Sequence, residues 1–313
     1  MIIRKDFNGE PLDVFLTIGF FDGIHLGHRR IIGEVVKKAR SSGVRSCVVT
    51  FDHHPSELFS GKPVKLLTSW EEKKEILSSL GVEIVQVFTF DYSFSTLHPH
   101  QFLQKLSNIF NIREILVGEE FTFGYKREGN VEFLSKNQHK FGYRLKAIPS
   151  VKLNGEKISS SLLRKWLSEG KIKMVIQGMG RFPTVVGKVI AGRGNGKKIG
   201  YPTANLQPHP QKLLPCSGVY AGFTKIEGRI YKTLVNIGER PTFGDFTPGV
   251  EAHIIDFAGE LYGRTLSVEL IRRIRDIQVF PSSVALSNQL KKDKDVAERI
   301  LERSGLLEYN KIK

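Results

Sequence analysis

Hydrophobic positions in the first 170 residues alternate between short continuous runs and stretches with helical spacing. The run Val14–Phe21 predicts a buried strand, and the apolar positions 31, 32, 35, 36 and 39 behind it share one helix face. The same alternation predicts strands at 46–51, 82–90, 114–118 and 143–148, and helices at 70–80, 100–110, 131–141 and 159–169. Strands separated by helices predict an α/β domain whose parallel sheet is covered on both faces.

The hydrophobic pattern changes after residue 183, where short strands follow one another without intervening helices. Strands are expected at 185–190, 219–226, 230–237, 250–257 and 266–271, and a helix at Ser282–Arg303. This pattern predicts an antiparallel barrel with one helix packed on it. Gly178, Gly180 and Pro183 mark the junction, so we expect one domain over 1–180 and a second over 181–313.

Composition narrows the protein class without identifying a ligand. Hydrophobic residues make up 40% and charged residues 25% of the chain, as in ordinary globular proteins. Its apolar runs are too short to span a bilayer, and the N-terminus has no secretory h-region, so we expect a cytoplasmic protein without a membrane partner. Cys47 and Cys216 lack a CxxC partner, which argues against a disulfide framework or a zinc site.

The net charge of +15 suits either nucleic acid or polyanionic small molecules. Basic residues are spread along the chain, and no nucleic-acid-binding motif is present. We therefore expect small-molecule substrates, no nucleic acid, and a monomer or weak homo-oligomer.

Candidate chemistry gathers where the first strand ends. His25 and His28 lie between this strand and the following helix and face its N-terminus, where free N–H groups and the dipole favour an anion. Gly27 allows a polyphosphate to approach the backbone closely. The turn therefore predicts a nucleotide site beyond the carboxyl end of a parallel strand, although His-x-x-His is also a metal-ligand spacing.

Three further stretches lie at strand-to-helix junctions. Thr50–Glu57 contains two histidines that can equally be exposed loop residues. Gly118–Gly129 contains phenylalanines that either belong to the core or flank an aromatic ligand. In Ile158–Arg164, three serines can cap a helix or donate to a phosphate, and Arg164 can neutralise negative charge.

The second half has its own glycine-rich basic loop, Gly192–Gly200, which runs into Tyr201–Asn205. It is not a Walker A loop, because Ala191 and Lys198 occupy positions that require glycine and Ser or Thr. The loop is either a flexible basic segment or a cradle for nucleotide phosphates. In the second case Thr203 and Asn205 supply hard oxygen ligands suited to Mg²⁺.

The N-terminal motifs together resemble those of prokaryotic FAD synthetases. Gly19–His28, GFFDGIHLGH, resembles the HxGH motif of the nucleotidyltransferase superfamily in the form found in that family. Thr50–Glu57 resembles the TFxPHP segment, with His53 where proline is usual. Residues 118–129 resemble GxDFxFGxxRxG, with Glu120 at the aspartate position, and 158–164 resemble ISSSxIR.

The C-terminal motifs resemble those of riboflavin kinases. Residues 192–205 resemble the signature GxxxGRxLGxPTAN, with Lys197 for the usual arginine. Further matches lie downstream, at 218–220, 236–243, 251–257, 261–263, 268–269 and 275–280. By this resemblance Glu269 is the general base that takes the proton from the ribityl 5′-hydroxyl.

Together the two resemblances imply a bifunctional riboflavin kinase and FAD synthetase. The implied fold is an N-terminal Rossmann-like nucleotidyltransferase domain with a parallel sheet, followed by an antiparallel β-barrel riboflavin kinase domain with a closing helix. The kinase converts riboflavin and ATP to FMN, and the adenylyltransferase joins FMN to AMP from ATP, giving FAD and pyrophosphate. Mg²⁺ is the implied cofactor.

The resemblance also implies the site residues. The implied catalytic residues are His25, His28, Arg164 and Glu269. The implied ATP and phosphate contacts are Gly19, Phe20, Asp22, Gly27, Ser159, Ser160, Ser161, Gly192, Gly196, Lys197, Lys198 and Asn205. The implied flavin contacts are His54, Pro55, Phe121, Phe123, Arg275 and Asp276, and the implied metal ligands are Thr203 and Asn205.

Two alternatives stay open at this point. One activity can have been lost, with His53, Glu120 and Lys197 marking the departures from the family patterns. The chain can also be a flavin- or nucleic-acid-binding regulator on an inactive enzyme scaffold.

Overall fold

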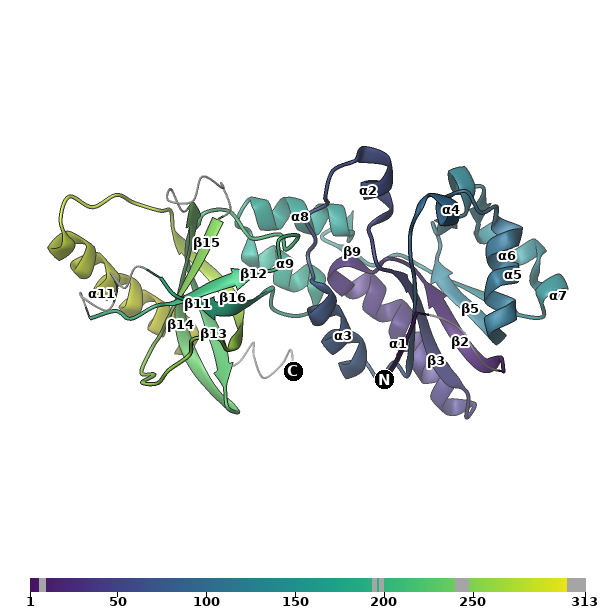
Figure 1. Ribbon diagram of the computed structural model, residues 1–313, viewed down its shortest axis with the longest axis horizontal. Coiled ribbons are helices and arrows are strands. Elements are labelled where there is room, and N and C mark those ends of the chain that lie inside the picture. Colours follow the sequence, from purple (N-terminus) through teal and green to yellow (C-terminus); the bar gives the residue numbers. More distant parts are fainter. Residues whose placement is uncertain (6–9, 193–195, 197–199, 240–247, 303–313) are drawn as a thin grey trace. The chain divides into compact units, whose positions relative to one another are not determined.

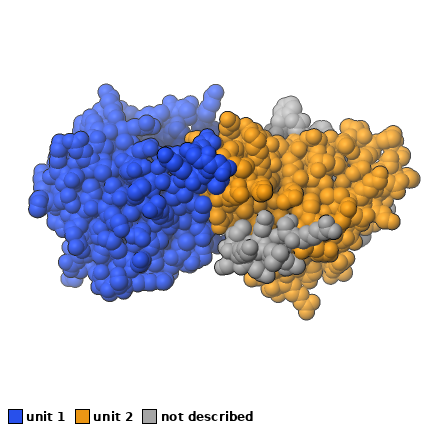
Figure 2. All heavy atoms as spheres, turned by 180° about the vertical axis from the view of Figure 1, so that it is seen from behind, with its two compact units in different colours: residues 1–65, 70–159 blue, residues 66–69, 160–313 orange. Residues whose placement is uncertain are grey.

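A computed structural model of the protein describes residues 1–5, 10–192, 196, 200–239 and 248–302 (Figure 1). The chain forms two compact units, shown in different colours in Figure 2. Unit 1 comprises residues 1–65 and 70–159, and unit 2 comprises residues 66–69 and 160–313. Within the described residues, no helix combines the length and the apolar character needed to cross a membrane.

Unit 1 is built on a six-stranded sheet whose strands are all parallel. The strand order is β1 (Ile2–Arg4), β4 (Ile84–Phe88), β3 (Arg45–Phe51), β2 (Leu12–Ile18), β5 (Phe110–Gly118) and β8 (Arg144–Ile148). The predicted parallel sheet is confirmed. The chain turns from β2 to β3 on one side and reaches β5 on the other, so the strand order reverses beside β2. In such sheets ligands bind beyond the carboxyl ends of the strands at this reversal.

Helices cover both faces of this sheet because side chains along β2 alternate between two apolar clusters. Val14 and Leu16 pack in a cluster with Leu103 of α5 (Pro99–Ile109). Phe15 points to the other face and packs with Val35 of α1 (Leu26–Ser41). A third cluster joins α1 to α3 (Trp70–Ser79).

Shorter elements complete unit 1. They are η1 (Asp22–Ile24), α2 (Pro55–Ser60), α4 (Tyr92–Ser95), β6 (Thr122–Phe123), η2 (Tyr125–Arg127), β7 (Gly129–Asn130), α6 (Val131–Lys136), α7 (Gln138–Phe141), β9 (Lys152–Leu153) and β10 (Glu156–Lys157). The helix predicted over 131–141 is divided at Asn137, whose backbone leaves the helical region (φ −100°, ψ 3°). The strand predicted to reach Phe21 ends at Ile18, and Phe21 itself has a left-handed backbone (φ 56°) that does not fit a strand.

Unit 2 contains a closed antiparallel barrel of six strands, as predicted. Around the barrel the order is β11 (Thr184–Ile190), β12 (Ala204–Pro208), β15 (Pro248–Ile254), β14 (Arg229–Glu239), β13 (Gly218–Ile226) and β16 (Thr265–Arg275). The predicted closing helix is α11 (Ser283–Ile300), which contacts β13, β14 and β16.

Two helices and a short strap precede or flank this barrel within unit 2. The helices are α8 (Ser160–Ser168) and α9 (Ile172–Met179). Both belong to unit 2, although the sequence predicted a domain boundary after them, at residue 180. The strap, Leu66–Ser69, is held by backbone hydrogen bonds from Leu66 N to Gln211 O (2.7 Å) and from Leu213 N to Leu66 O (2.8 Å).

Helix α9 and strand β12 were not predicted from the sequence, each for a physical reason. Gly178 was assigned to the junction between the domains, but it lies inside α9, where a Cβ atom would come within 2.7 Å of Leu163. The glycine therefore allows close packing of α8 on α9. Strand β12 was missed because its first residues, Ala204 and Asn205, belong to the segment assigned to phosphate and metal binding.

Candidate functional sites

The segment Gly19–His28, here called the histidine turn, leaves the carboxyl end of β2 and enters α1. The Gly19 N–H donates to Val49 O of β3 (3.0 Å), which fixes the start of the turn. Phe21 and Ile24 both have positive φ, at 56° and 36°. Non-glycine residues in this region store strain and persist where the surrounding structure holds them, a feature concentrated at functional sites.

The two histidines of the turn are packed against each other. The His25 Nδ1 accepts the His28 N–H (3.3 Å), which caps α1, and the imidazole rings stack with centroids 3.6 Å apart. The Phe21 ring meets His28 edge-on at 5.1 Å. A Cβ atom at Gly27 would lie 3.1 Å from Cε1 of His25, so a side chain there would crowd the imidazole.

Both imidazoles are neutral at pH 7. Burial, followed by the charge of Lys157, lowers the pKa of His25 to about 4. Burial, followed by the charges of His25 and Lys73, holds the pKa of His28 well below its usual value. The Nδ1 of His28 is buried, and no described residue forms a hydrogen bond with it. Buried polar atoms are normally satisfied, so this nitrogen keeps a hydrogen-bonding position that no described residue fills.

Side chains from β3, from α3 and from the N-cap residue of α2 converge on Phe20 of the turn. Lys73 Nζ (2.6 Å) and Thr50 Oγ1 (3.2 Å) both donate to the Phe20 carbonyl oxygen. The His54 ring lies 4.8 Å from the Phe20 ring, edge-on, and His54 caps α2 by accepting the Ser56 N–H (3.2 Å). The structure therefore brings the predicted flavin contact His54 to the histidine turn. Sequence reasoning missed Lys73 because no local pattern links it to residue 20.

The predicted aromatic pair is half-buried at the edge of the core. Phe121 and Phe123 stack nearly parallel, with centroids 5.5 Å apart, and pack against the cluster under α5. Glu120, which replaces the usual aspartate, forms an ion pair with Lys157 of β10. Since Lys157 also acts on His25, this pair belongs to the electrostatic surroundings of the turn.

The predicted serine and arginine group spans the two units. Ser159 is the last residue of unit 1, whereas Ser160, Ser161 and Arg164 open α8 in unit 2. The helix is anchored by its buried residues Leu163, Trp166 and Leu167. The roles of the serines and Arg164 at the histidine turn stay predictions.

In unit 2 the structure brings together the described part of the glycine-rich loop and the predicted metal ligands. Asn205 is 8% exposed, and a Cβ atom at Gly192 would lie 2.0 Å from its amide nitrogen, so backbone covers this side chain. Tyr201 N donates to Gly196 O (2.8 Å), and the Cβ position of Gly196 is 3.4 Å from Thr203 Oγ1. Lys197 and Lys198 lie outside the described residues.

Strand register adds a carboxylate to this group that sequence reasoning did not single out. Asn205 of β12 lies directly opposite Glu251 of β15, and Glu251 lies opposite Asn236 of β14. Their strand neighbours Leu206, Val250 and Val235 are buried in the barrel, so these three polar residues share its outer face. Opposed residues have Cβ atoms about 5 Å apart, which puts Glu251 within reach of Asn205.

The same register separates Glu269 from Asn205. Glu269 of β16 lies opposite Thr184, whereas Asn205 lies opposite Ile190, at the other end of β11. The six residue steps between these positions span about 20 Å at about 3.3 Å per residue. Glu269 and Asn205 therefore lie far apart along the barrel. The sequence could not reveal this separation, because pairing between distant strands is set by the fold.

The predicted flavin contacts Arg275 and Asp276 have protein partners. The Arg275 guanidinium donates to both oxygens of Asp293 on α11, at 2.9 Å from Nε and 2.7 Å from Nη2. Asp293 is 2% exposed, so the ion pair is buried. The Asp276 carboxylate is exposed and pairs with Arg273. Arg275 therefore holds α11 on the barrel, and its contact with flavin stays a prediction.

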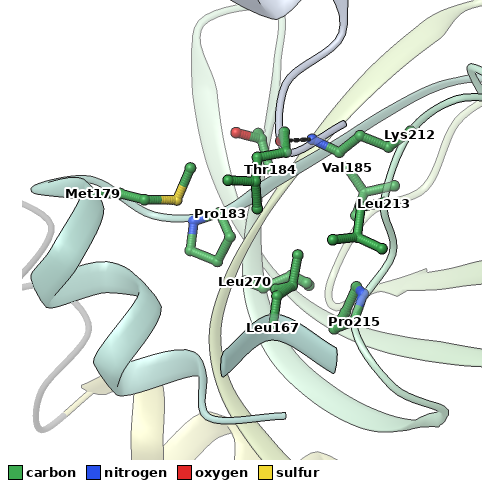
Figure 3. Close-up of a pocket in the computed structure, with 10 residues that line it drawn as sticks. Leu167, Met179, Pro183, Thr184, Val185, Lys212, Leu213, Pro215 and Leu270 are labelled. Atoms are coloured by element: carbon green, nitrogen blue, oxygen red, sulfur yellow. Dashed lines mark hydrogen bonds between the residues drawn. The ribbon is translucent and has the colours of Figure 1, made fainter. Parts of the chain in front are cut away.

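The pocket in Figure 3 lies within unit 2 and is lined mostly by apolar side chains, including Leu167, Met179 and Leu270. The Lys212 side chain lies at the edge of the pocket, and its Nζ donates to Leu67 O of the strap (2.8 Å). None of the predicted site residues lines this pocket. Across the described residues, no group of three or more His, Cys, Asp or Glu is arranged to hold a metal ion.

Comparisons with known proteins match the chain in two parts. The family described as FAD synthetase matches residues 8–162, and the family described as riboflavin kinase matches residues 179–301. A curated relative from Bacillus subtilis (strain 168), a bifunctional riboflavin kinase/FMN adenylyltransferase, is 32% identical and covers 93% of each chain. A relative of the same name from Escherichia coli (strain K12) is 33% identical over 89% of this chain and 90% of its own.

A solved structure extends the likeness to the fold. The crystal structure of a protein named macrolide-efflux protein, from Streptococcus pneumoniae, superposes with a TM-score of 0.86 at 30% identity. The superposition covers 95% of this chain and 98% of that chain. Both units therefore have counterparts in that protein.

Proposed function

The chain belongs to the family of bifunctional riboflavin kinase/FMN adenylyltransferases, and we propose that its two reactions use separate sites, adenylyl transfer in unit 1 and phosphoryl transfer in unit 2. The kinase phosphorylates riboflavin to FMN with ATP, and the adenylyltransferase converts FMN and ATP to FAD and pyrophosphate. The FAD synthetase match ends at residue 162 and the riboflavin kinase match begins at 179, which supports this division.

Adenylyl transfer in unit 1 needs positioning and charge stabilisation more than a strong base. The phosphate of FMN is already anionic at neutral pH, so its oxygen can attack the α-phosphate of ATP without losing a proton. Neutral His25 and His28 would donate hydrogen bonds to the phosphates at the N-terminus of α1, where the helix dipole adds favourable charge. The buried Nδ1 of His28, without a partner among the described residues, is the observation that carries this assignment.

The outer face of the barrel suits phosphoryl transfer. Thr203 and Asn205 would hold Mg²⁺, because their hydroxyl and amide oxygens are hard ligands that leave room for phosphate oxygens and water. Bound there, the ion would neutralise charge that develops on the transferred phosphoryl group. Lys197 and Lys198 of the adjoining loop stay predicted phosphate contacts.

We propose Glu251 instead of Glu269 as the general base of the kinase. The base must lie within hydrogen-bond reach of the hydroxyl, and the hydroxyl must face the phosphoryl group beside the metal. Glu251 meets this requirement through its register with Asn205, whereas Glu269 lies about 20 Å along the barrel. Glu251 is half-buried and keeps access from the outer face.

A time course of flavin products tests the proposed function. The purified chain is incubated with riboflavin, ATP and Mg²⁺, and flavins are separated by chromatography. We expect FMN first and FAD later. FMN without FAD would contradict the proposed adenylyltransferase activity. A lack of FMN would contradict the proposed kinase activity. Cytoplasmic location, the lack of a nucleic-acid partner and a monomeric or weakly oligomeric state stay predictions.

A further inference from the structure

Lys73 is a buried cation of unit 1 that contacts the histidine turn. Lys73 is 3% exposed, and its Nζ donates to the Phe20 carbonyl oxygen at 2.6 Å. The same nitrogen lies 4.0 Å from the centroid of the Phe20 ring. One ammonium therefore holds both the backbone and the side chain of a residue in the turn.

A buried ammonium is costly unless something compensates its charge. Among the described residues, Lys73 forms no ion pair with a carboxylate; Asp22 of the turn attracts it at longer range. Burial lowers the pKa of Lys73 to about 8, an effect that Asp22 partly opposes. Lys73 therefore stays mostly protonated at pH 7, while His25 and His28 are neutral.

The place of this charge matters because the turn is strained. Phe21 has a left-handed backbone directly after Phe20, and such conformations persist only when neighbouring groups hold them. Lys73 from α3 and Thr50 from β3 hold the Phe20 carbonyl from two elements. A polyphosphate bound at this turn would also be stabilised by a positive charge, which the neutral histidines of the turn do not supply.

We propose that Lys73 is a positioning residue of the adenylyl-transfer site, which fixes the histidine turn through the Phe20 carbonyl and supplies positive charge beneath bound ATP. The proposal rests on the proposed function of unit 1. It predicts that loss of the ammonium weakens ATP binding in FAD formation more than it slows turnover.

The test compares Lys73→Met with Lys74→Met, measuring FAD formation from FMN and ATP. Met keeps the unbranched chain and removes both charge and hydrogen bonds. Lys74 is its neighbour on α3, with a side chain 34% exposed beside Glu71, so it is a matched control. We expect Lys73→Met to raise the KM for ATP on the order of tenfold to hundredfold, with a smaller change in kcat. Lys74→Met should match the unchanged chain.

Three further measurements make the result decisive. Lys73→Arg, which keeps the charge, should recover part of the loss in KM. Riboflavin phosphorylation by the same preparations should not change, because the kinase is assigned to unit 2. If Lys73→Met does not fold, Thr50→Val tests the same carbonyl and should raise the KM for ATP by a smaller factor.

Each outcome distinguishes the two proposals. An unchanged KM for ATP in folded Lys73→Met, or in Thr50→Val if Lys73→Met does not fold, would overturn the role of Lys73. Equal losses in Lys73→Met and Lys73→Arg would overturn the role of its charge. If the unchanged chain forms no FAD from FMN, it is the proposed function of unit 1 that fails.

Discussion

At the scale of single residues, the kinase site depends on which carboxylate faces the metal ligands. We predict that Glu251→Gln lowers riboflavin phosphorylation by a factor on the order of 100 or more, because the amide cannot accept the proton of the hydroxyl. FMN adenylylation should stay within about twofold, because unit 1 is untouched. Formation of FMN and of FAD from supplied FMN are measured separately.

Glu269→Gln is the matched control for this prediction. It makes the same change on the same barrel face, about 20 Å from Asn205 along the strand direction. The control should keep nearly full kinase activity. Loss of phosphorylation in Glu269→Gln, with Glu251→Gln active, would restore the assignment made from sequence resemblance.

The sequence indicated candidate residues for both sites, but not which of them the fold brings together. Motifs pointed to His25, His28, Thr203 and Asn205, because phosphate and metal chemistry restricts which side chains can serve. Register decides that Glu251 faces Asn205, and register follows from barrel closure. Likewise Lys73 meets Phe20 only because α3 packs beside η1.

At the scale of elements, the strand and helix patterns predicted the main architecture correctly. Continuous apolar runs became the buried parallel strands, and spaced apolar residues became helices on both faces. The prediction of helices failed where a residue type that usually ends a helix was needed for close packing. Gly178 lies inside α9 because it permits contact with Leu163, although glycine usually ends a helix.

The helix α11 provides a prediction at this scale. Arg275→Met leaves Asp293 as a buried carboxylate without its bidentate partner, which typically costs about 3 kcal/mol. We expect the free energy of unfolding of unit 2 to fall by about that amount. Urea unfolding can be followed by fluorescence of Trp166, which lies in unit 2, after replacement of Trp70 by Phe.

Arg264→Met is the control for the Arg275 variant. Arg264 also pairs with a carboxylate in unit 2, Glu227, but both side chains are largely exposed. Its loss should cost less than about 1 kcal/mol. Equal effects of the two substitutions would mean that Arg275 does not anchor α11, and would free its guanidinium for the predicted flavin contact.

At the scale of the whole molecule, two hydrophobic patterns in one chain predicted two domains of different fold. Alternating strands and helices gave the parallel sheet, and closely spaced strands gave the barrel. The sequence did not reveal the strap Leu66–Ser69, a segment within the first pattern that pairs with residues 211 and 213 of unit 2. Its backbone hydrogen bonds depend on residues far away along the chain.

Two separate sites lead to a prediction about whole chains in mixture. His28→Ala should form FMN but little FAD, and Glu251→Gln should form FAD only from supplied FMN. If FMN leaves the kinase site into solution, a mixture of the two variants should convert riboflavin to FAD. Flavin chromatography of the mixture, with each variant alone as the control, measures this complementation. FMN accumulation without FAD in the mixture, although Glu251→Gln uses supplied FMN, would mean that the intermediate does not pass between chains.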